Sequence, residues 1–503
     1  MTGALGEDAL ADGALGDRGA GTLLVVDVEV AGSARTCVRI EAGRITAVGP
    51  WSVLGRSASG AAVLDGGGGA MVAGLRDHHL HLLSLAARRA SVACGPPAVR
   101  TVDALGSALR RATARVGPGE WVRGVDYDDT VTGPLDAPAL DALLGDRADR
   151  LVRVQHRSGH AWILNGSAVR AVGLTELADP GVERRGDGTV TGVVYELDRW
   201  LGERVAPGDR PDLSDVGAML ARCGVVGLTD ATATNGPAEL AILDAAVRGG
   251  ALPQRVRLLG GDDLRAPPTG TVDVGQRKVV LAERDLPELD WLVETVRAAG
   301  ARGVAIHCVS REALVLAVSA LLEAGTEGGV ERGSAGRRHR IEHASVAPPD
   351  VVHLVRSAGP VVVTQPSFVA RHGDRYLREV APGDLPWLYR VGGWVAAGVP
   401  LAGGSDAPFG PADPWMGIRA AVERRTEEGQ LLGTAERVTP EQALALYQSR
   451  LADPGGPPQR VEPGAPADVC VLSLPWADAR RELSSEMVSA TVIGGSVVWE
   501  RRH

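Results

Sequence analysis

The sequence has few cysteines and lacks any pair of them at the spacing of a metal or redox motif. The total of five is odd and the residues are scattered along the chain, which argues against a disulfide framework. We therefore expect buried, reduced thiols at these positions: Cys37, Cys94, Cys223, Cys308 and Cys470.

Long hydrophobic runs are also missing. No segment approaches the about 20 uninterrupted apolar residues that a transmembrane helix needs. The N-terminal stretch carries acidic residues and has no compact apolar core, unlike a secretory signal peptide. We therefore expect a cytoplasmic protein with no membrane partner.

An excess of positive charge is absent as well. The chain has 53 basic and 62 acidic side chains, interspersed along its length, and a formal net charge of -9 at pH 7. Proteins that bind nucleic acids carry clustered lysines and arginines, so we expect no nucleic-acid partner. The charge says little about a small-molecule substrate, which is the partner that we expect. A homodimer stays open.

The two ends of the chain share one pattern of short strands. Residues 1–21 are rich in Gly, Ala and Asp without periodicity, which predicts a disordered arm. Residues 22–70 and 454–503 contain β-branched runs between glycine turns, which are typical of small antiparallel sheets. We expect both segments to form one small β-sandwich domain around the rest of the chain.

Residues 71–453 alternate between short apolar runs and amphipathic helical segments. This alternation predicts an α/β fold, a (β/α)8 TIM-like barrel whose active site lies at the carboxyl ends of the strands. The long gap over 84–220 follows the first run and predicts an inserted substrate lobe. The eight runs lie at 73–82, 224–232, 255–260, 277–282, 303–309, 340–346, 360–366 and 399–408.

Polar residues gather at the ends of these runs, and strand ends converge in a barrel. Neutral imidazoles with a carboxylate suit zinc or a similar divalent ion. In "DHHLH", a strand places His79 and His81 on one side, about 6 to 7 Å apart, and places His78 on the other side as a packing residue. A lysine would bind a cation only after conversion to a carbamate. The candidate ligands are His79, His81, Lys278, His307, His343 and Asp406.

These segments are similar to motifs of the metal-dependent amidohydrolase superfamily, and more narrowly of its YtcJ-like (amidohydrolase 3) branch. The matching segments are "AGLRDHHLH", "RKVVLA", "VAIHC", "RIEHA" and "GGSDAP". The resemblance implies one or two divalent ions, with zinc expected; a mononuclear centre would use fewer of the candidate ligands. In the binuclear arrangement that it implies, the ligands are His79, His81 and Asp406 on one ion, His307 and His343 on the other, and a carboxylated Lys278 bridging them.

The resemblance also implies a hydrolase. Metal-activated hydroxide would attack an amide-like carbon, and Asp406 would act as general base and then as general acid toward the leaving nitrogen. We therefore expect hydrolysis of a carbon–nitrogen bond other than a peptide bond, in an amide, formamide or cyclic amide. Two alternatives stay open: a mononuclear deaminase of the same superfamily, and a catalytically silent homologue acting as a binding protein.

Four further residues are candidate substrate contacts, and each has a structural alternative. In "GHAWILN", the alternative is a capped helix start with a packed Trp162. The acid of "TGVVYE" is either an active-site carboxylate or a salt-bridged surface residue. The glutamine at the end of the seventh strand either lines the pocket or forms part of a turn before Pro366. The four candidates are His160, Asn165, Glu196 and Gln365.

Overall fold

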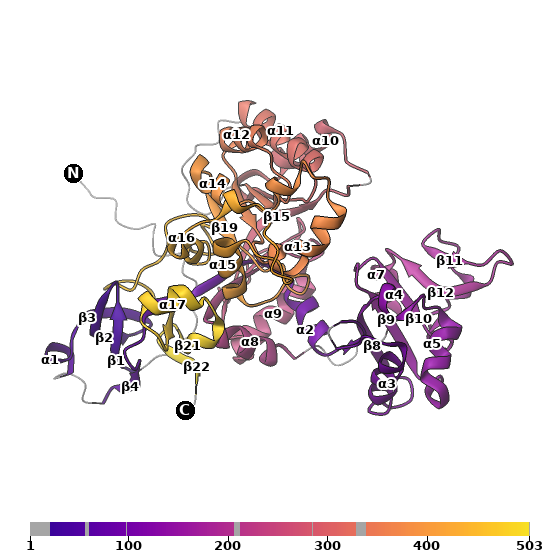
Figure 1. Cartoon of the computed structure of the whole chain (residues 1–503), viewed down its shortest axis with the longest axis horizontal. Helices are drawn as coiled ribbons and strands as arrows, with labels where there is room; N and C mark the ends of the chain where they lie inside the picture. Colours follow the sequence, from indigo (N-terminus) through magenta and orange to yellow (C-terminus); the bar gives the residue numbers. More distant parts are fainter. Residues whose placement is uncertain are drawn as a thin grey trace. The chain divides into compact units, whose positions relative to one another are not determined.

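The computed structural model describes residues 21–55, 60–96, 98–205, 212–283, 285–327 and 339–501. The chain forms two compact units, one of Met1–Leu82 with Leu213–His503 and one of Leu83–Asp212 (Figure 1). The arm predicted over 1–21 lies outside the described residues, apart from Gly21.

The first unit contains a parallel eight-stranded sheet with the order β19-β18-β17-β16-β15-β14-β13-β6. The predicted barrel strands are present, and the barrel is nearly closed. Two backbone hydrogen bonds link the segment after β19 to β6: Asp406 N donates to His79 O and His81 N donates to Ala407 O, both at 2.7 Å. The strands are β6 (Leu75–Leu80), β13 (Val225–Asp230), β14 (Arg255–Gly260), β15 (Val272–Val280), β16 (Val304–Cys308), β17 (Arg340–His343), β18 (Val361–Thr364) and β19 (Leu401–Gly403).

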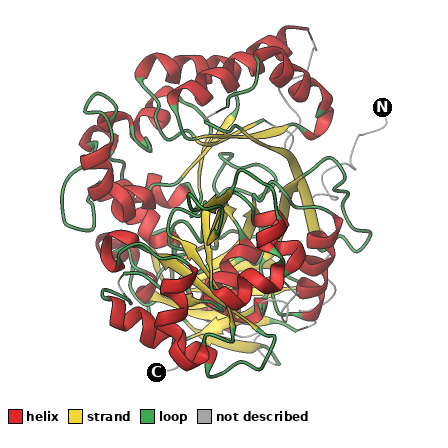
Figure 2. Ribbon diagram, turned by 90° about the vertical axis from the view of Figure 1, so that its right-hand side faces the viewer, coloured by secondary structure: helices red, strands yellow, loops and turns green. Residues whose placement is uncertain are grey.

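Amphipathic helices cover the outside of this sheet. Ile306 of β16 and Ile341 of β17 share a buried core with Leu292 of α10, Leu314 of α11 and Val352 of α12; these helices lie outside the strands at the top of both views (Figure 1 and Figure 2). This burial of aliphatic side chains holds the strands in place, at about 1.5 to 3 kcal/mol for each fully buried side chain. The helices of the unit are α8 (Leu213–Arg222), α9 (Pro237–Gly249), α10 (Leu289–Ala298), α11 (Arg311–Glu327), α12 (Pro349–Ala358), α13 (Ser367–Glu379), α14 (Gly392–Ala397), α15 (Pro414–Glu423), α16 (Pro440–Ala445) and α17 (Trp476–Glu482), with α1 (Trp51–Leu54) near the N-terminus.

Two four-stranded sheets, ordered β3-β2-β1-β4 and β22-β21-β20-β5, complete the first unit. Val25 and Ile40 from the N-terminal sheet share a hydrophobic core with Val469 and Val492 from the other sheet. Strands from both ends of the chain therefore contribute to one core. The strands are β1 (Leu23–Val30), β2 (Ser33–Glu41), β3 (Arg44–Pro50), β4 (Ala62–Asp65), β5 (Met71–Ala73), β20 (Val469–Leu472), β21 (Val488–Ile493) and β22 (Ser496–Glu500).

The second unit is built on a six-stranded sheet ordered β11-β12-β10-β9-β8-β7. It begins at Leu83, one residue before the insertion predicted over 84–220, and ends at Asp212, so that α8 belongs to the first unit. Its two faces bury separate hydrophobic cores. The elements are β7 (Val92–Ala93), β8 (Trp121–Tyr127), β9 (Leu151–His156), β10 (Ala161–Leu164), β11 (Val182–Arg184), β12 (Val190–Tyr195), α3 (Val102–Thr113), α4 (Asp129–Thr132), α5 (Ala137–Leu144), α6 (Gly166–Val172) and α7 (Asp198–Arg204), and α2 (Leu82–Arg89) precedes them.

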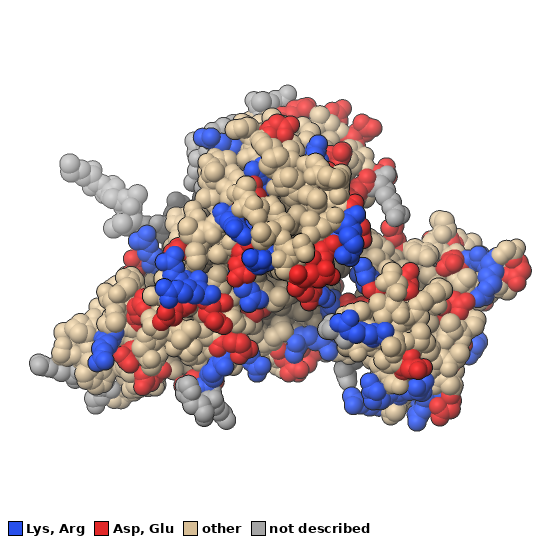
Figure 3. Space-filling model, in the orientation of Figure 1, with Lys and Arg blue, Asp and Glu red and all other residues tan. Residues whose placement is uncertain are grey.

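All five cysteines are buried free thiols. Burial raises the pKa of the Cys94 thiol and of the Cys223 thiol to about 12. Within the described residues, no helix has the length and apolar character needed to cross a membrane. On the face of the first unit shown in Figure 3, basic and acidic side chains are interspersed rather than gathered by sign.

Candidate metal centre

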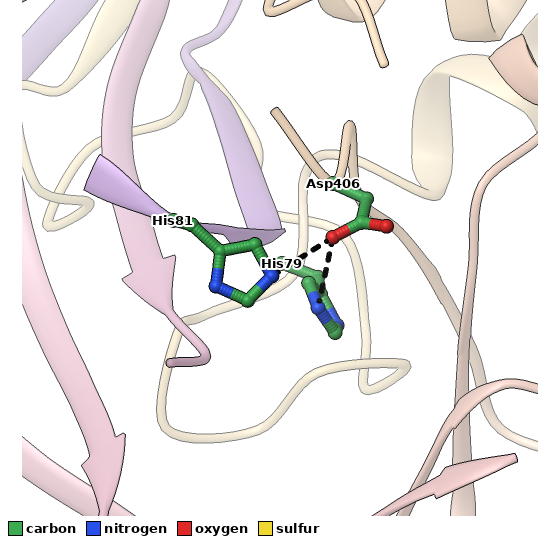
Figure 4. A group of neighbouring side chains, drawn as sticks. All are labelled: His79, His81 and Asp406. Atoms are coloured by element: carbon green, nitrogen blue, oxygen red, sulfur yellow. Dashed lines mark ion pairs between the residues drawn. The ribbon is translucent and has the colours of Figure 1, made fainter. Parts of the chain in front are cut away.

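His79, His81 and Asp406 come together at the carboxyl ends of the barrel strands. One possible ligand atom from each side chain lies within 4.8 Å of the other two (Figure 4). Asp406 Oδ1 lies 3.0 Å from His81 Nε2 and 3.3 Å from His79 Nε2. The alternation along β6 brings both imidazoles to one side, while His78 Nε2 lies 3.1 Å from Ser449 Oγ instead.

The segment that carries Asp406 is tied to β6 by a buried carboxylate. Asp77 Oδ1 accepts hydrogen bonds from Ser405 N at 3.0 Å and from His79 N at 3.1 Å. Asp406 itself has a positive φ of 53°, a backbone conformation that is costly for a residue with a side chain and is found where a site requires it. Asp77 therefore helps to hold the Asp406 carboxylate in front of the two imidazoles.

Three imidazoles of the site have their Nδ1 atoms occupied by protein groups. His79 Nδ1 donates to Glu342 Oε2 at 2.5 Å, and His343 Nδ1 donates to Gln365 Oε1 at 2.8 Å. His81 Nδ1 is hydrogen-bonded to Thr232 Oγ1 at 2.8 Å. Such contacts leave Nε2 as the nitrogen that is free to bind a metal.

Glu342, the buried partner of His79, is a residue of the candidate site that the sequence reasoning missed. Arg340 Nε donates to Glu342 Oε1 at 2.7 Å, and Arg340 Nη2 donates to His78 O at 2.7 Å. Burial by itself raises the pKa of Glu342, but Arg340 and Lys278 outweigh that effect and hold the pKa well below its usual value. The signal was present in "RIEHA", because an acid inside a buried strand must be paired.

His307 and His343 lie beside the first group of ligands. Their ring centroids are 4.5 Å apart, and the His343 ring is 4.8 Å from the His79 ring. Burial lowers the pKa of His307 to about 4 and holds the pKa of His343 well below its usual value. Both imidazoles are therefore neutral near pH 7, which is the form that binds metal ions.

Lys278 is buried in the same part of the barrel. Its Nζ atom makes no hydrogen bond to any described residue. Burial lowers the pKa of the Lys278 ammonium, and the charge of Glu342 opposes that shift. A buried amine with a depressed pKa is suited to carbamate formation, because the neutral amine is the nucleophile.

The residues present fit a divalent ion. The set offers imidazole nitrogens and a carboxylate oxygen, which are ligands of zinc and similar metals. Asp406 Oδ1 is buried without a hydrogen bond of regular geometry, although two imidazole Nε2 atoms face it. Metal ligands are expected to be arranged in this way: imidazole nitrogens face a carboxylate oxygen that receives no regular hydrogen bond.

A family model described as "Amidohydrolase family" matches residues 62–499. The chain belongs to the amidohydrolase family. The resemblance stated from the sequence motifs is thereby confirmed. Family membership makes the protein a hydrolase that acts on carbon–nitrogen bonds other than peptide bonds.

Two relatives cover nearly the whole amidohydrolase chain. The N-substituted formamide deformylase of Arthrobacter pascens is 26% identical over 529 residues, covering 94% of this chain and 96% of the relative. The amidohydrolase YtcJ of Bacillus subtilis (strain 168) is 24% identical over 498 residues, covering 86% and 90%.

Solved structures of metal-dependent hydrolases share the fold. An uncharacterized one from Pyrococcus horikoshii OT3 has a TM-score of 0.71 at 19% identity and covers 90% of this chain and 97% of its own. An uncharacterized one from Pyrococcus furiosus has a TM-score of 0.69 at 20% identity, with coverage of 89% and 98%. At these identities the likeness shows the fold alone.

Two predicted substrate contacts of the amidohydrolase lie together in the second unit. His160 Nδ1 is 3.9 Å from Glu196 Oε1, and the side chains are 73% and 67% exposed. Glu196 N donates to His160 O at 2.9 Å, and Glu196 has a positive φ of 57°. The structure thus presents an imidazole and a carboxylate to solvent, side by side.

The other two predicted substrate contacts are buried. Asn165 caps α6: its Oδ1 accepts from Ala168 N at 3.1 Å and from Val152 N at 3.0 Å, and Trp162 packs in the adjacent core. These contacts match the alternative of a capped helix start. Gln365 is buried as well, and its contact is with His343.

Proposed function

We propose that the protein hydrolyses the carbon–nitrogen bond of an amide, formamide or cyclic amide in a small molecule. The convergence of His79, His81 and Asp406 at the barrel mouth carries this proposal. Family membership implies the small-molecule substrate. The cytoplasmic location and the homodimer stay predictions.

The metal centre would use the residues expected from the sequence. When bound, a divalent ion supplies a Lewis acid and a water nucleophile at neutral pH. Zinc is the proposed ion, and Lys278 would join the centre after carboxylation. The proposed ligands are His79, His81 and Asp406 for one ion, His307 and His343 for a second, and Lys278 between them.

Asp406 is the proposed proton carrier. The hydrogen bond from Asp406 N to His79 O ties its backbone to β6, which keeps the carboxylate next to the two imidazoles. It would accept a proton from the water molecule that adds to the carbonyl carbon, and pass that proton to the leaving nitrogen as the carbon–nitrogen bond breaks. Glu342 and Gln365 hold two imidazole ligands in the orientation that this arrangement needs.

A formamide is the first substrate class to test. The N-substituted formamide deformylase of Arthrobacter pascens spans 94% of this chain at 26% identity, which supports that choice. His160 and Glu196 are the proposed substrate contacts in the second unit, since both side chains are exposed and adjacent.

A mononuclear deaminase is the second candidate. Within the described residues, His79, His81 and Asp406 form the only group of three His, Cys, Asp or Glu ligands close enough to hold one ion. A centre built on this group alone needs no carboxylated lysine. Counting metal ions per chain, with and without bicarbonate, separates the two candidates.

The deciding experiment combines elemental analysis with a substrate screen. The purified protein is expected to carry a stoichiometric divalent metal, and either to release amine from N-formyl or N-acyl compounds or to open the ring of cyclic amides. Asp406→Asn is expected to lower turnover by about a hundredfold or more. Absence of metal, or full turnover by a metal-loaded Asp406→Asn variant, contradicts the proposal.

A further inference from the structure

Two arginines stand side by side in the second unit, away from the metal ligands in the sequence. Arg123 of β8 and Arg153 of β9 are register partners on parallel strands, so their side chains leave the same face of the sheet. Their Cζ atoms lie 5.3 Å and 4.9 Å from the centre of the Trp162 ring on β10. Both guanidinium groups are only partly exposed.

This pair carries more positive charge than its surroundings neutralise. Among the described residues, no carboxylate forms an ion pair with Arg123 or Arg153. Asp198 is the acid whose charge acts on both of them, and its Oδ1 already accepts from Trp162 Nε1 at 2.8 Å. Burial, together with the neighbouring charge of Arg123, lowers the pKa of Arg153 to about 10.

Most hydrogen-bond donors of the pair are unused. Arg123 Nη2 donates to Gln155 Oε1 at 3.1 Å, while Nε of each arginine has no acceptor among the described residues. A guanidinium presents several N–H donors in a planar fork that matches an oxyanion. The contact with Trp162 restrains both guanidinium groups, so less side-chain entropy is lost when a ligand binds.

We propose that Arg123 and Arg153 form a binding site for an oxyanion, such as a carboxylate or a phosphate group. The anion would bridge the two guanidinium groups through charge-assisted hydrogen bonds. It would also relieve the repulsion between two cations that are partly removed from water. The site belongs to the second unit and does not depend on the proposed hydrolysis.

The test is calorimetric titration of the full chain with inorganic phosphate and, separately, with acetate at constant ionic strength. We expect saturable binding by at least one of them. Arg153→Gln is expected to weaken it by about tenfold or more, because charge-assisted donors are lost. Tighter binding of acetate identifies a carboxylate as the natural group, and tighter binding of phosphate identifies a phosphate.

Asp198→Asn provides a test in the opposite direction. Asparagine keeps an oxygen to accept from Trp162 Nε1 but removes the negative charge next to the pair, so binding is expected to tighten severalfold. Because this variant gains affinity, misfolding cannot mimic the result. Arg170→Gln is the matched control, since Arg170 is exposed on α6 of the same unit, its Nη2 donates to Ser167 Oγ, and its loss removes the same charge.

Three results would overturn the proposal. One is the absence of saturable binding by the unmodified protein. Another is equal weakening by Arg153→Gln and Arg170→Gln, which would show only the effect of net charge. The third is unchanged or weaker binding by Asp198→Asn, in which case the arginines serve only to pack against Trp162.

Discussion

His79 Nδ1 lies 2.5 Å from Glu342 Oε2, and this contact leaves His79 Nε2 facing Asp406. Glu342 is held in turn by Arg340. The orientation of this proposed metal ligand therefore depends on a carboxylate of β17, a strand that is not next to β6 in the sheet.

Glu342→Gln is expected to lower metal affinity by about 10- to 100-fold, because a glutamine holds the His79 ring and its tautomer less firmly. Affinity is measured by competition with a chelator of known strength. Glu436→Gln is the matched control, since Glu436 is also buried and paired with an arginine, Arg390, at 2.8 Å. Equal metal affinity of Glu342→Gln and the unmodified protein would contradict the positioning role.

Alanine substitutions at three neighbouring histidines are expected to differ in their effect. His79→Ala and His81→Ala remove proposed ligands and should abolish stoichiometric metal binding. His78→Ala should keep the metal and lower the free energy of unfolding by about 1 to 3 kcal/mol, because it removes a buried side chain that contacts Ser449. Metal per chain and denaturant unfolding are the two measurements. Equal metal loss in all three variants would contradict the prediction that His78 lies on the opposite side of the strand from His79 and His81.

Removal of the metal is expected to lower stability as well as activity. A ligand that binds only the folded chain adds about 4 kcal/mol when its free concentration is about 1,000 times its Kd. Chelation should therefore lower the unfolding temperature by several degrees, and addition of zinc should restore it. A His79→Ala protein, measured in parallel, should show no shift on chelation.

The cysteines are expected to resist thiol reagents in the folded protein. The thiolate is the reactive form, and a raised pKa keeps the thiol protonated. Since the pKa values of Cys94 and Cys223 are raised to about 12, their thiolate fractions stay far below that of an exposed cysteine between about pH 7 and pH 9, so both should be modified far more slowly than an exposed cysteine at each pH in this range. Thiol counting with and without denaturant measures this. Rapid modification in the folded state would contradict the burial.

The barrel strands were predictable from the sequence because parallel strands buried on both faces form continuous apolar runs. Their ends then indicated His307, His343 and Asp406, and the spacing of two residues indicated His79 and His81. The partner of Glu342 was not predictable, because an acid within a strand has the same sequence pattern whether it pairs with a lysine, an arginine or a histidine. Its contact with His79 joins residues 263 positions apart.

The role of Asn165 was also beyond sequence reasoning. An asparagine before a helix suits both a cap and a substrate contact, and the decisive evidence is the backbone N–H of Val152 on another strand.

The C-terminal boundary of the second unit could not be read from the sequence either. The periodicity of α8 shows an amphipathic helix but does not show which unit its apolar face packs against.

The separate cores of the second unit have a consequence for how this enzyme can diversify. Leu83–Asp212 buries its own hydrophobic side chains on both faces of its sheet, so its folding draws on contacts made within the segment. Mutations there can accumulate without eroding the packing that holds the barrel ligands. We therefore expect this segment to tolerate substitution more readily than the barrel strands, whose packing positions His79, His81 and Asp406.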